Sequence, residues 1–277
     1  MQVAPHVYAM HIDDGAPSHP GGSNNFFVGD PKKGMVLIDT GEHQRKWTQA
    51  ILKEYKDLGK PKIKAILITH GHNDHVGGVD RVWDVMQAPV RCHPKLAKRV
   101  KELVGEDFVQ PLKSREMIDT GGGVKLRALY TPGHEIDHIC YYLRDDRIMF
   151  TGDTVLGSSS STVRDLGAYM KSLQTLMSFK YDIVCPAHGE IVQPPRGPRL
   201  VGLYLKHRQE REAQVIDALK KGAVTVDDIV KHVYPRNLKK ALRGGAARNV
   251  TSHLEKLSKE GRVKEAPAKF AMTSKRK

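Results

Sequence analysis

Four side chains that can bind a metal ion lie within six consecutive residues of this sequence. The segment reads HGHNDH over residues 70–75, directly after the apolar run AILIT, which predicts a buried strand. Imidazole and carboxylate ligands together suit zinc, or a similar borderline ion, better than magnesium. A tight loop after a strand can turn two of them toward one ion and two toward another, which favours a metal site over a solvated histidine-rich loop. The four candidates are His70, His72, Asp74 and His75.

Three further candidate ligands each come soon after a run that is typical of a buried strand. His134 follows LRALY, Asp153 follows RIMF, and His188 follows DIVC. Alone, a His or Asp at a strand end is more often a turn residue. Together with the segment at 70–75, however, they make a donor set large enough for a two-metal catalytic site with open positions for water. The sequence therefore predicts that one edge of a sheet collects the ligands of two zinc ions.

The elements that must position these residues alternate between strands and helices. Short apolar runs that end in turn residues predict strands, and apolar residues three or four apart predict the helices between them. This alternation predicts an α/β fold class, in which helices are layered on sheets. We expect strands over 35–39, 65–69, 124–130, 139–143, 147–151 and 182–185, and helices over 43–58, 76–86, 94–104 and 166–179.

The pattern changes after the proline-rich stretch 194–198. Three helices are then expected, and the second has a capping-box-like start at Thr225, with Asp228 three residues later. Three helices followed by a hairpin are typical of a winged-helix module. The expected helices are 200–221, a short one from Thr225 and 246–260, and the expected hairpin spans 262–273.

The domain organisation predicted from this change is a catalytic domain over 1–199 and a linking helix with a basic winged-helix-like module over 200–277. The net charge is +14, and residues 206–277 carry 19 Lys and Arg against 8 Asp and Glu, while residues 1–205 are nearly balanced. Such asymmetry indicates a module that meets a polyanion, although basic residues that only solvate a helical surface remain an alternative. The candidate contacts to such a polyanion are Lys239, Lys240, Arg243, Arg248 and Arg262.

The order H-x-H-x-D-H, then a single His, a single Asp and a single His, resembles the metallo-β-lactamase superfamily over roughly residues 5–195. The resemblance implies an αββα sandwich with the metal site on one edge. Asp39, in VLIDTG, matches an early Asp that orients the metal loop without binding the metal itself. The resemblance further implies that His70, His72 and His134 bind one zinc ion, that Asp74, His75 and His188 bind a second, and that Asp153 bridges both.

A narrower resemblance covers nearly the whole chain. The stretches TVRDLGAYMKSL from residue 162, HRQERE from residue 207 and HLEKLSKEGRV from residue 253 are similar to the β-lactamase-like protein 2 endoribonucleases. Asn24 matches that group, whereas Gly244 and Gly245, expected just before the third helix, depart from it. The resemblance implies a zinc-dependent endoribonuclease and favours the mitochondrial matrix, while the lack of a clear presequence keeps the cytoplasm as an alternative. Such an enzyme would cleave single-stranded RNA with a hydroxide held between two metals, with Asp74 and Asp153 as catalytic carboxylates.

Two alternatives stay open. The same ligands serve thioesterases and glyoxalase-II-like hydrolases of acyl thioesters, and an inert hydrolase domain attached to a nucleic-acid-binding protein would also carry this fold. The basic last quarter of the chain favours RNA, and the complete ligand set argues against an inert domain. RNA sequence preference, the physiological metal and the oligomeric state are not determined by the sequence.

Composition adds several expectations. No stretch approaches the roughly 20 apolar residues that span a bilayer, and the N-terminus lacks the pattern of a secretory signal, so no membrane partner is expected. Three widely spaced cysteines in apolar runs predict buried thiols without a disulfide. Other residues are expected to play supporting roles: Cys92, Cys140 and Cys185 in the core, His6, His11 and His19 at the surface or in turns, and His138 in a solvated or supporting position.

Overall fold

Two β-sheets form the centre of the first unit of the chain, Met1–Arg208. The computed structural model describes residues 1–13, 15, 19 and 21–264. Within them, one sheet has the order β1-β2-β3-β4-β5-β6 and the other the order β11-β10-β9-β8-β7. The strands of the first sheet are Gln2–Ala4, Val7–Ile12, Ser23–Asp30, Gly34–Ile38, Ile63–Leu67 and Val90–Arg91 (β1 to β6). Those of the second are Met117–Asp119, Lys125–Tyr130, Ile139–Leu143, Ile148–Gly152 and Ile183–Pro186 (β7 to β11).

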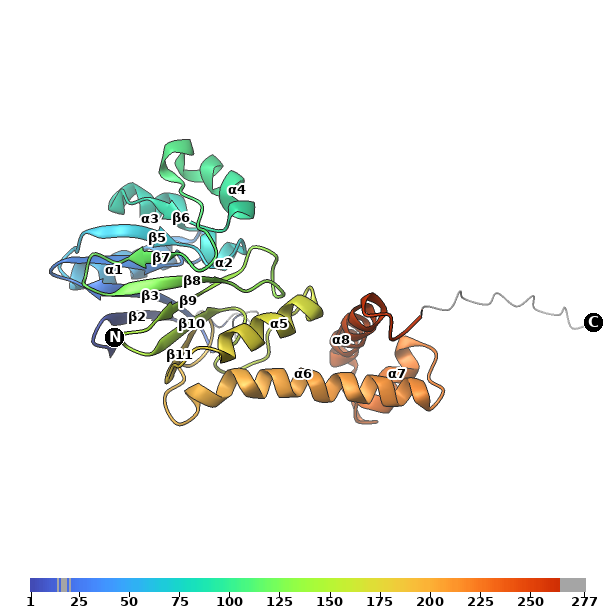
Figure 1. Cartoon of the computed structure of the whole chain (residues 1–277). Helices are drawn as coiled ribbons and strands as arrows, with labels where there is room; N and C mark the ends of the chain where they lie inside the picture. Colours follow the sequence, from blue (N-terminus) through green and yellow to red (C-terminus); the bar gives the residue numbers. More distant parts are fainter. Residues whose placement is uncertain (14, 16–18, 20, 265–277) are drawn as a thin grey trace, which may run out of the picture. The chain divides into compact units, whose positions relative to one another are not determined.

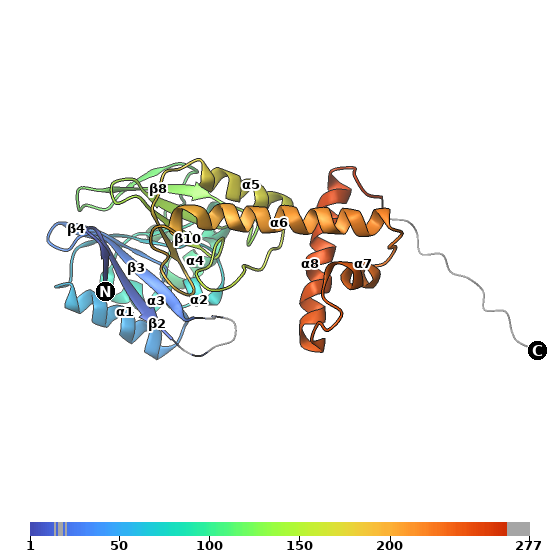
Figure 2. The ribbon, with the colours of Figure 1, turned by 90° about the horizontal axis from the view of Figure 1, so that it is seen from below.

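Helices cover the outer faces of the two sheets (Figure 1). The helices α1, α3 and α4 pack on the first sheet, and α1 lies against β2 (Figure 2). The helix α5 and the first part of α6 pack on the second sheet. The helices are Arg45–Asp57, Asn73–Val76, Val79–Met86, Pro94–Val104, Leu166–Met177 and Gly197–Lys220 (α1 to α6), with a short 3-10 turn at Glu106–Phe108.

Three apolar layers hold this arrangement together. Between the sheets, Val36 of β4 and Phe150 of β10 belong to one buried cluster. The outer layers join Ile51 of α1 to the first sheet and Leu173 of α5 to the second. Removing these faces from water stabilises both sheets at once. The α/β class and the αββα sandwich expected from the sequence are confirmed.

The helix predicted over 76–86 is interrupted, because the chain after β4 crosses it. The amide of Gly78 donates to the carbonyl of Gly41 at 3.0 Å, and a Cβ on Gly78 would lie 2.5 Å from the Thr40 carbonyl oxygen. No larger residue allows this approach. The Thr40 amide in turn donates to the His75 carbonyl at 2.8 Å, so the crossing fixes the histidine-rich segment.

Several elements differ from expectation. The strands β1 and β2 were not predicted, and His11 lies on β2. The helix α8, Lys240–Lys259, begins six residues before the expected 246, with Gly244 and Gly245 inside it. Each helical glycine costs about 1 kcal/mol, and burial of Ala246 and Val250 on the same helix offsets that cost.

The second unit begins at Gln209, within α6, whereas the sequence placed the boundary after residue 199. It contains the end of α6, α7 (Val226–Val233) and α8. Its core includes Val215, Ile229 and Val250. The expected hairpin at 262–273 lies mainly outside the described residues.

Two further expectations concern the cysteines and membrane-spanning helices. The three cysteines, all among the described residues, are buried free thiols. Among the described residues, no helix is both long and apolar enough to cross a membrane.

The predicted capping box at the start of α7 is confirmed, which yields a stability test. Thr225 Oγ1 accepts from the Asp228 amide at 3.1 Å, and Asp228 accepts from the Thr225 amide at 3.3 Å. Thr225→Ala should therefore destabilise the second unit by about 1 kcal/mol in denaturant unfolding. Thr251→Ala, at an exposed position inside α8, is the matched control and should not destabilise. Equal stability of the two variants would contradict the cap.

Candidate metal centre

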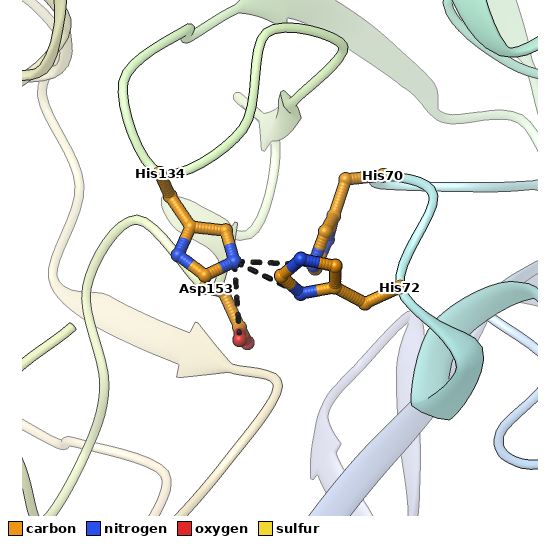
Figure 3. Close-up of side chains that lie close together, drawn as sticks. All are labelled: His70, His72, His134 and Asp153. Atoms are coloured by element: carbon orange, nitrogen blue, oxygen red, sulfur yellow. Dashed lines mark hydrogen bonds and ion pairs between the residues drawn. The ribbon is translucent and has the colours of Figure 1, made fainter. Parts of the chain in front are cut away.

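The seven predicted ligands converge at one edge of the sandwich. His70, His72, Asp74 and His75 follow β5, His134 follows β8, Asp153 follows β10 and His188 follows β11. Three groups of these side chains, one of which also contains His19, have ligand atoms within 4.8 Å of one another. Figure 3 shows four of these side chains pointing toward one another: His70 and His72 come from the segment after β5, and His134 and Asp153 come from two other segments.

The first group of donor atoms has the spacing of a metal's coordination shell. His134 Nε2 lies 3.3 Å from His70 Nε2, 3.3 Å from His72 Nδ1 and 3.6 Å from Asp153 Oδ2. Ligands about 2 Å from a tetrahedral zinc ion lie about 3.3 Å from one another.

A second group lies on the other side of the Asp153 carboxylate. His188 Nε2 is 3.1 Å from Asp74 Oδ2 and 3.3 Å from Asp153 Oδ1, and His75 Nε2 is 3.4 Å and 3.5 Å from the same two oxygens. The two oxygens of Asp153 thus face different groups. This is the arrangement that a bridging carboxylate requires.

Neighbouring acceptors fix which nitrogen of each ring is free to bind a cation. Nδ1 of His134 donates to the Thr162 carbonyl at 2.9 Å, Nε2 of His72 donates to Glu135 at 3.2 Å, and Nδ1 of His75 donates to Asp39 at 2.8 Å. The other nitrogen of each ring faces the cluster and carries a lone pair when the ring is neutral.

Electrostatics keep the rings of His70 and His134 in the neutral, metal-binding form and favour a proton on His75, which a bound metal ion would displace. Burial lowers the pKa of His70 and His134, which keeps these rings neutral. Burial also opposes a charge on His75, but the carboxylates of Asp74, Asp39 and Asp153 raise its pKa well above the ordinary value. Burial alone would raise the pKa of Asp74, but His75 and His188 hold it well below its usual range. The centre is therefore rich in negative charge.

Two buried polar atoms at the centre lack hydrogen-bond partners within the described part of the chain and indicate a site for a cation. His75 Nε2 and Asp153 Oδ1 have no hydrogen-bond partner among the described residues, and they lie 3.5 Å apart. A buried polar atom without a partner costs about 1–3 kcal/mol, and more when it is charged. A divalent cation satisfies both atoms at once. The nitrogen and oxygen donor set fits such an ion, and zinc suits it well.

The loop that carries His134 is held by the helix α5. Gly133 has φ 139°, and a Cβ there would lie 2.5 Å from both the backbone nitrogen and the Cβ of Tyr169. Only glycine permits this conformation and approach. The carbonyl of Gly133 also accepts from the amides of Arg164 and Asp165 just before α5. The helix α5 thus fixes the loop that carries His134.

Asp39 lies behind His75, where the resemblance placed an orienting residue. It is buried and accepts from the Thr69 amide and hydroxyl at 2.8 Å each, in addition to His75. Its φ of 61° is uncommon for a residue other than glycine. The strained backbone aims both carboxylate oxygens at the strand end that begins the histidine-rich segment.

Two histidines outside the predicted ligand set support the centre, and a supporting position was among those expected for His138 but not for His19. His138 is fully buried, and its Nε2 accepts from the Asp153 amide at 3.0 Å. His19, expected at the surface or in a turn, is 6% exposed. Its ring stacks on His188 at 4.8 Å, and its Nε2 lies 3.2 Å from Asp74 Oδ2. The position of His138 four residues after a ligand was a usable signal, whereas nothing in the sequence distinguishes His19.

Comparison with known proteins agrees with this geometry. Residues 19–188 match the metallo-β-lactamase superfamily, and residues 225–269 match the β-lactamase-associated winged helix domain. The chain belongs to the metallo-β-lactamase superfamily, a family of metal-dependent hydrolases, and its C-terminal module is a winged-helix domain.

Relatives within the superfamily carry different names. The β-lactamase-like protein 2 homolog of Drosophila melanogaster is 32% identical over 88% of this chain and 84% of its own length. An atrochrysone carboxyl ACP thioesterase of Passalora fulva is 32% identical over 87% of this chain and 72% of its own length. A β-lactamase domain protein of Burkholderia ambifaria has the same fold, with a TM-score of 0.74, 18% identity, and coverage of 94% of this chain and 89% of that one.

Asp153→Ala tests whether one carboxylate serves both donor groups. Without it the two groups lose their shared anion, so bound zinc should fall and hydrolysis of any substrate that the unchanged protein cleaves should be abolished. Zinc is measured by mass spectrometry of the dialysed protein. Asp145→Ala, at an exposed turn position, should retain both properties. Full zinc content and activity in Asp153→Ala would show that the seven ligands are misassigned.

Glu135→Ala tests the orientation of His72. Its carboxylate accepts from His72 and also pairs with Arg164 at 2.7 Å. Its loss should weaken zinc affinity about 10–100-fold, because the His72 ring is no longer held in one orientation. Competition with a fluorescent chelator measures the affinity. The control is Glu102→Ala, at an exposed position on α4, and equal affinity of the two variants would exclude the orienting role.

Proposed function

We propose that the centre holds two zinc ions and that the protein is an endoribonuclease of single-stranded RNA. The observation that carries the choice of RNA is the unpaired positive charge of the winged-helix domain. Lys239, Lys240, Arg243 and Arg248 are exposed, and none has an acidic partner among the described residues. Arg262 differs from the other candidates, since it pairs with Glu212 at 2.8 Å and Glu260 at 3.3 Å.

The donor groups support two ions because each has its own lone pairs. His70, His72 and His134 supply three nitrogens on one side of Asp153, and Asp74, His75 and His188 supply an oxygen and two nitrogens on the other. When bound, zinc lowers the pKa of water toward neutrality and stabilises negative charge that develops on the substrate.

The residues of the chain would prepare the site for attack on phosphorus. Asp153 would hold the two donor groups at a fixed separation. His138 fixes the backbone of Asp153, because its Nε2 accepts a hydrogen bond from the Asp153 amide. The neutral rings of His70 and His134 leave net positive charge on a loaded centre, which favours an anionic phosphodiester.

A thioesterase is the second candidate. It is favoured by the 32% identity to a protein named as an acyl carrier protein thioesterase, over 87% of this chain. The ligand set would serve attack on a thioester carbonyl equally well. RNA is preferred because every nucleotide of a strand offers a phosphate to the clustered cations of the winged-helix domain, whereas a thioester group itself is uncharged.

A parallel assay separates the two candidates. Zinc-loaded protein is incubated with a single-stranded RNA and, separately, with an acyl thioester, and Asp153→Ala serves as the inactive control. We expect internal cleavage of the RNA at a rate far above that of the thioester. Thioester hydrolysis with the RNA left intact would replace this proposal with the second candidate.

Charge neutralisation tests the role of the winged-helix domain. Changing Lys239, Lys240, Arg243 and Arg248 to Gln should weaken RNA binding and lower the slope of log affinity against log salt by roughly 0.7 for each RNA phosphate that the domain no longer neutralises. Binding is measured by fluorescence anisotropy at several salt concentrations. Arg262→Gln is the comparison, since that side chain is already paired. If the fourfold variant binds with an unchanged slope, these cations only solvate the domain.

A further inference from the structure

A pocket of about 570 Å³ lies within the first unit, beside the metal centre but lined by none of its ligands. Its walls are the loop after β10 and the first part of α6, with Glu190 at the rim. The loop side presents three consecutive hydroxyl groups, and the helix side presents basic and aromatic groups. The lining side chains that matter here are Ser158, Ser159, Ser160, Tyr204, His207 and Arg208.

Arg208 is a buried cation in this pocket. Its side chain is 5% exposed, its Nη2 donates to the Ser161 carbonyl at 3.0 Å, and its Cζ lies 5.5 Å from the centre of the Tyr169 ring. Its Nε is buried without a hydrogen-bond partner, and no carboxylate pairs with it among the described residues. A guanidinium stays charged at all physiological pH values, and burying one without a counter-ion is costly.

The other charged groups of the pocket do not neutralise Arg208. Glu190 is the one carboxylate among the lining residues, and it pairs with Arg196 at 2.6 Å. Its charge is therefore matched within the wall. The pocket keeps a net positive charge, next to serine hydroxyls that donate hydrogen bonds. This combination recognises a tetrahedral oxyanion such as phosphate.

The pocket and the metal centre share one loop. Ser161 Oγ lies 3.3 Å from His134 Nδ1, and the Thr162 carbonyl accepts from the same nitrogen. At the other end of the loop, the Gly157 amide donates to the His188 carbonyl at 3.0 Å. The loop that lines the pocket thus contacts two of the predicted metal ligands, His134 and His188.

We propose that this pocket is a phosphate subsite in which Arg208 binds the anion with hydroxyl groups of the loop after β10. The source of the anion, but not the subsite itself, rests on the proposed function. If the protein cleaves RNA, the occupant of the subsite is a non-scissile phosphate of the RNA strand. Free inorganic phosphate has the same chemistry and would occupy the same subsite.

The test measures binding of inorganic phosphate to the zinc-loaded full chain by calorimetry. Arg208→Gln should weaken the phosphate affinity of the subsite at least tenfold, and Arg208→Lys should lie in between, because it keeps the charge but loses the planar fork. Arg199→Gln removes an exposed cation of the same helix outside this pocket and should bind as the unchanged protein does. Phosphate that binds at the metals should contribute the same signal in all three variants, so a difference between them reports on the pocket.

A second pair of variants avoids disturbing the buried arginine. Ser160 is exposed at the pocket wall. Ser160→Glu places a carboxylate there and should weaken phosphate binding much more than Ser160→Gln, which has the same size. Unchanged phosphate affinity in both Arg208→Gln and Ser160→Glu would overturn the subsite.

Kinetics with RNA identifies the source of the anion. If the occupant is a phosphate of the strand, Arg208→Gln should raise KM for single-stranded RNA about tenfold, more than it lowers kcat. The protein could fail to cleave RNA while Arg208→Gln still weakens phosphate binding. In that case the subsite binds free phosphate, and only the proposed function is wrong.

Discussion

The structure depends on a group of buried imidazoles and carboxylates that cannot supply hydrogen bonds for all of one another's polar atoms. At one edge of the sandwich, lone pairs from several rings meet at 3.3 Å, and the oxygens of Asp74 and Asp153 lie among them without internal donors for every atom. Such a concentration of acceptors is unfavourable in a protein interior unless a cation is present. The rest of the first unit can be understood as the means of holding these atoms in place.

The sandwich does this by bringing strand ends together. Each ligand follows a strand whose apolar face is buried in one of the three layers, so its backbone is fixed by packing that has nothing to do with metal. Supporting residues then fix single atoms: Asp39 holds His75, Glu135 holds His72, and His138 holds the amide of Asp153. This division predicts that changes in the supporting residues weaken metal binding although the ligands lie on loops.

Much of this was predictable because the signals are local. The spacing of HGHNDH and the apolar runs before His134, Asp153 and His188 are short-range patterns, and they were sufficient to expect the set of candidate ligands. The αββα sandwich was expected from the resemblance to the superfamily. The same holds for the capping box at Thr225.

What the sequence did not reveal depends on contacts between distant segments. His19 is buried among side chains from distant segments, such as Trp47 and His188, and Arg208 contacts the loop after β10 from α6. The early start of α8 through two glycines similarly reflects tertiary burial overriding helix propensity.

The most direct test of the account is anomalous diffraction at the zinc absorption edge from crystals of the zinc-loaded protein. The account predicts two peaks at the centre, one bound by His70, His72 and His134 and the other by Asp74, His75 and His188, with Asp153 between them. A map with no peak among these side chains, or with zinc held by other residues, would contradict it.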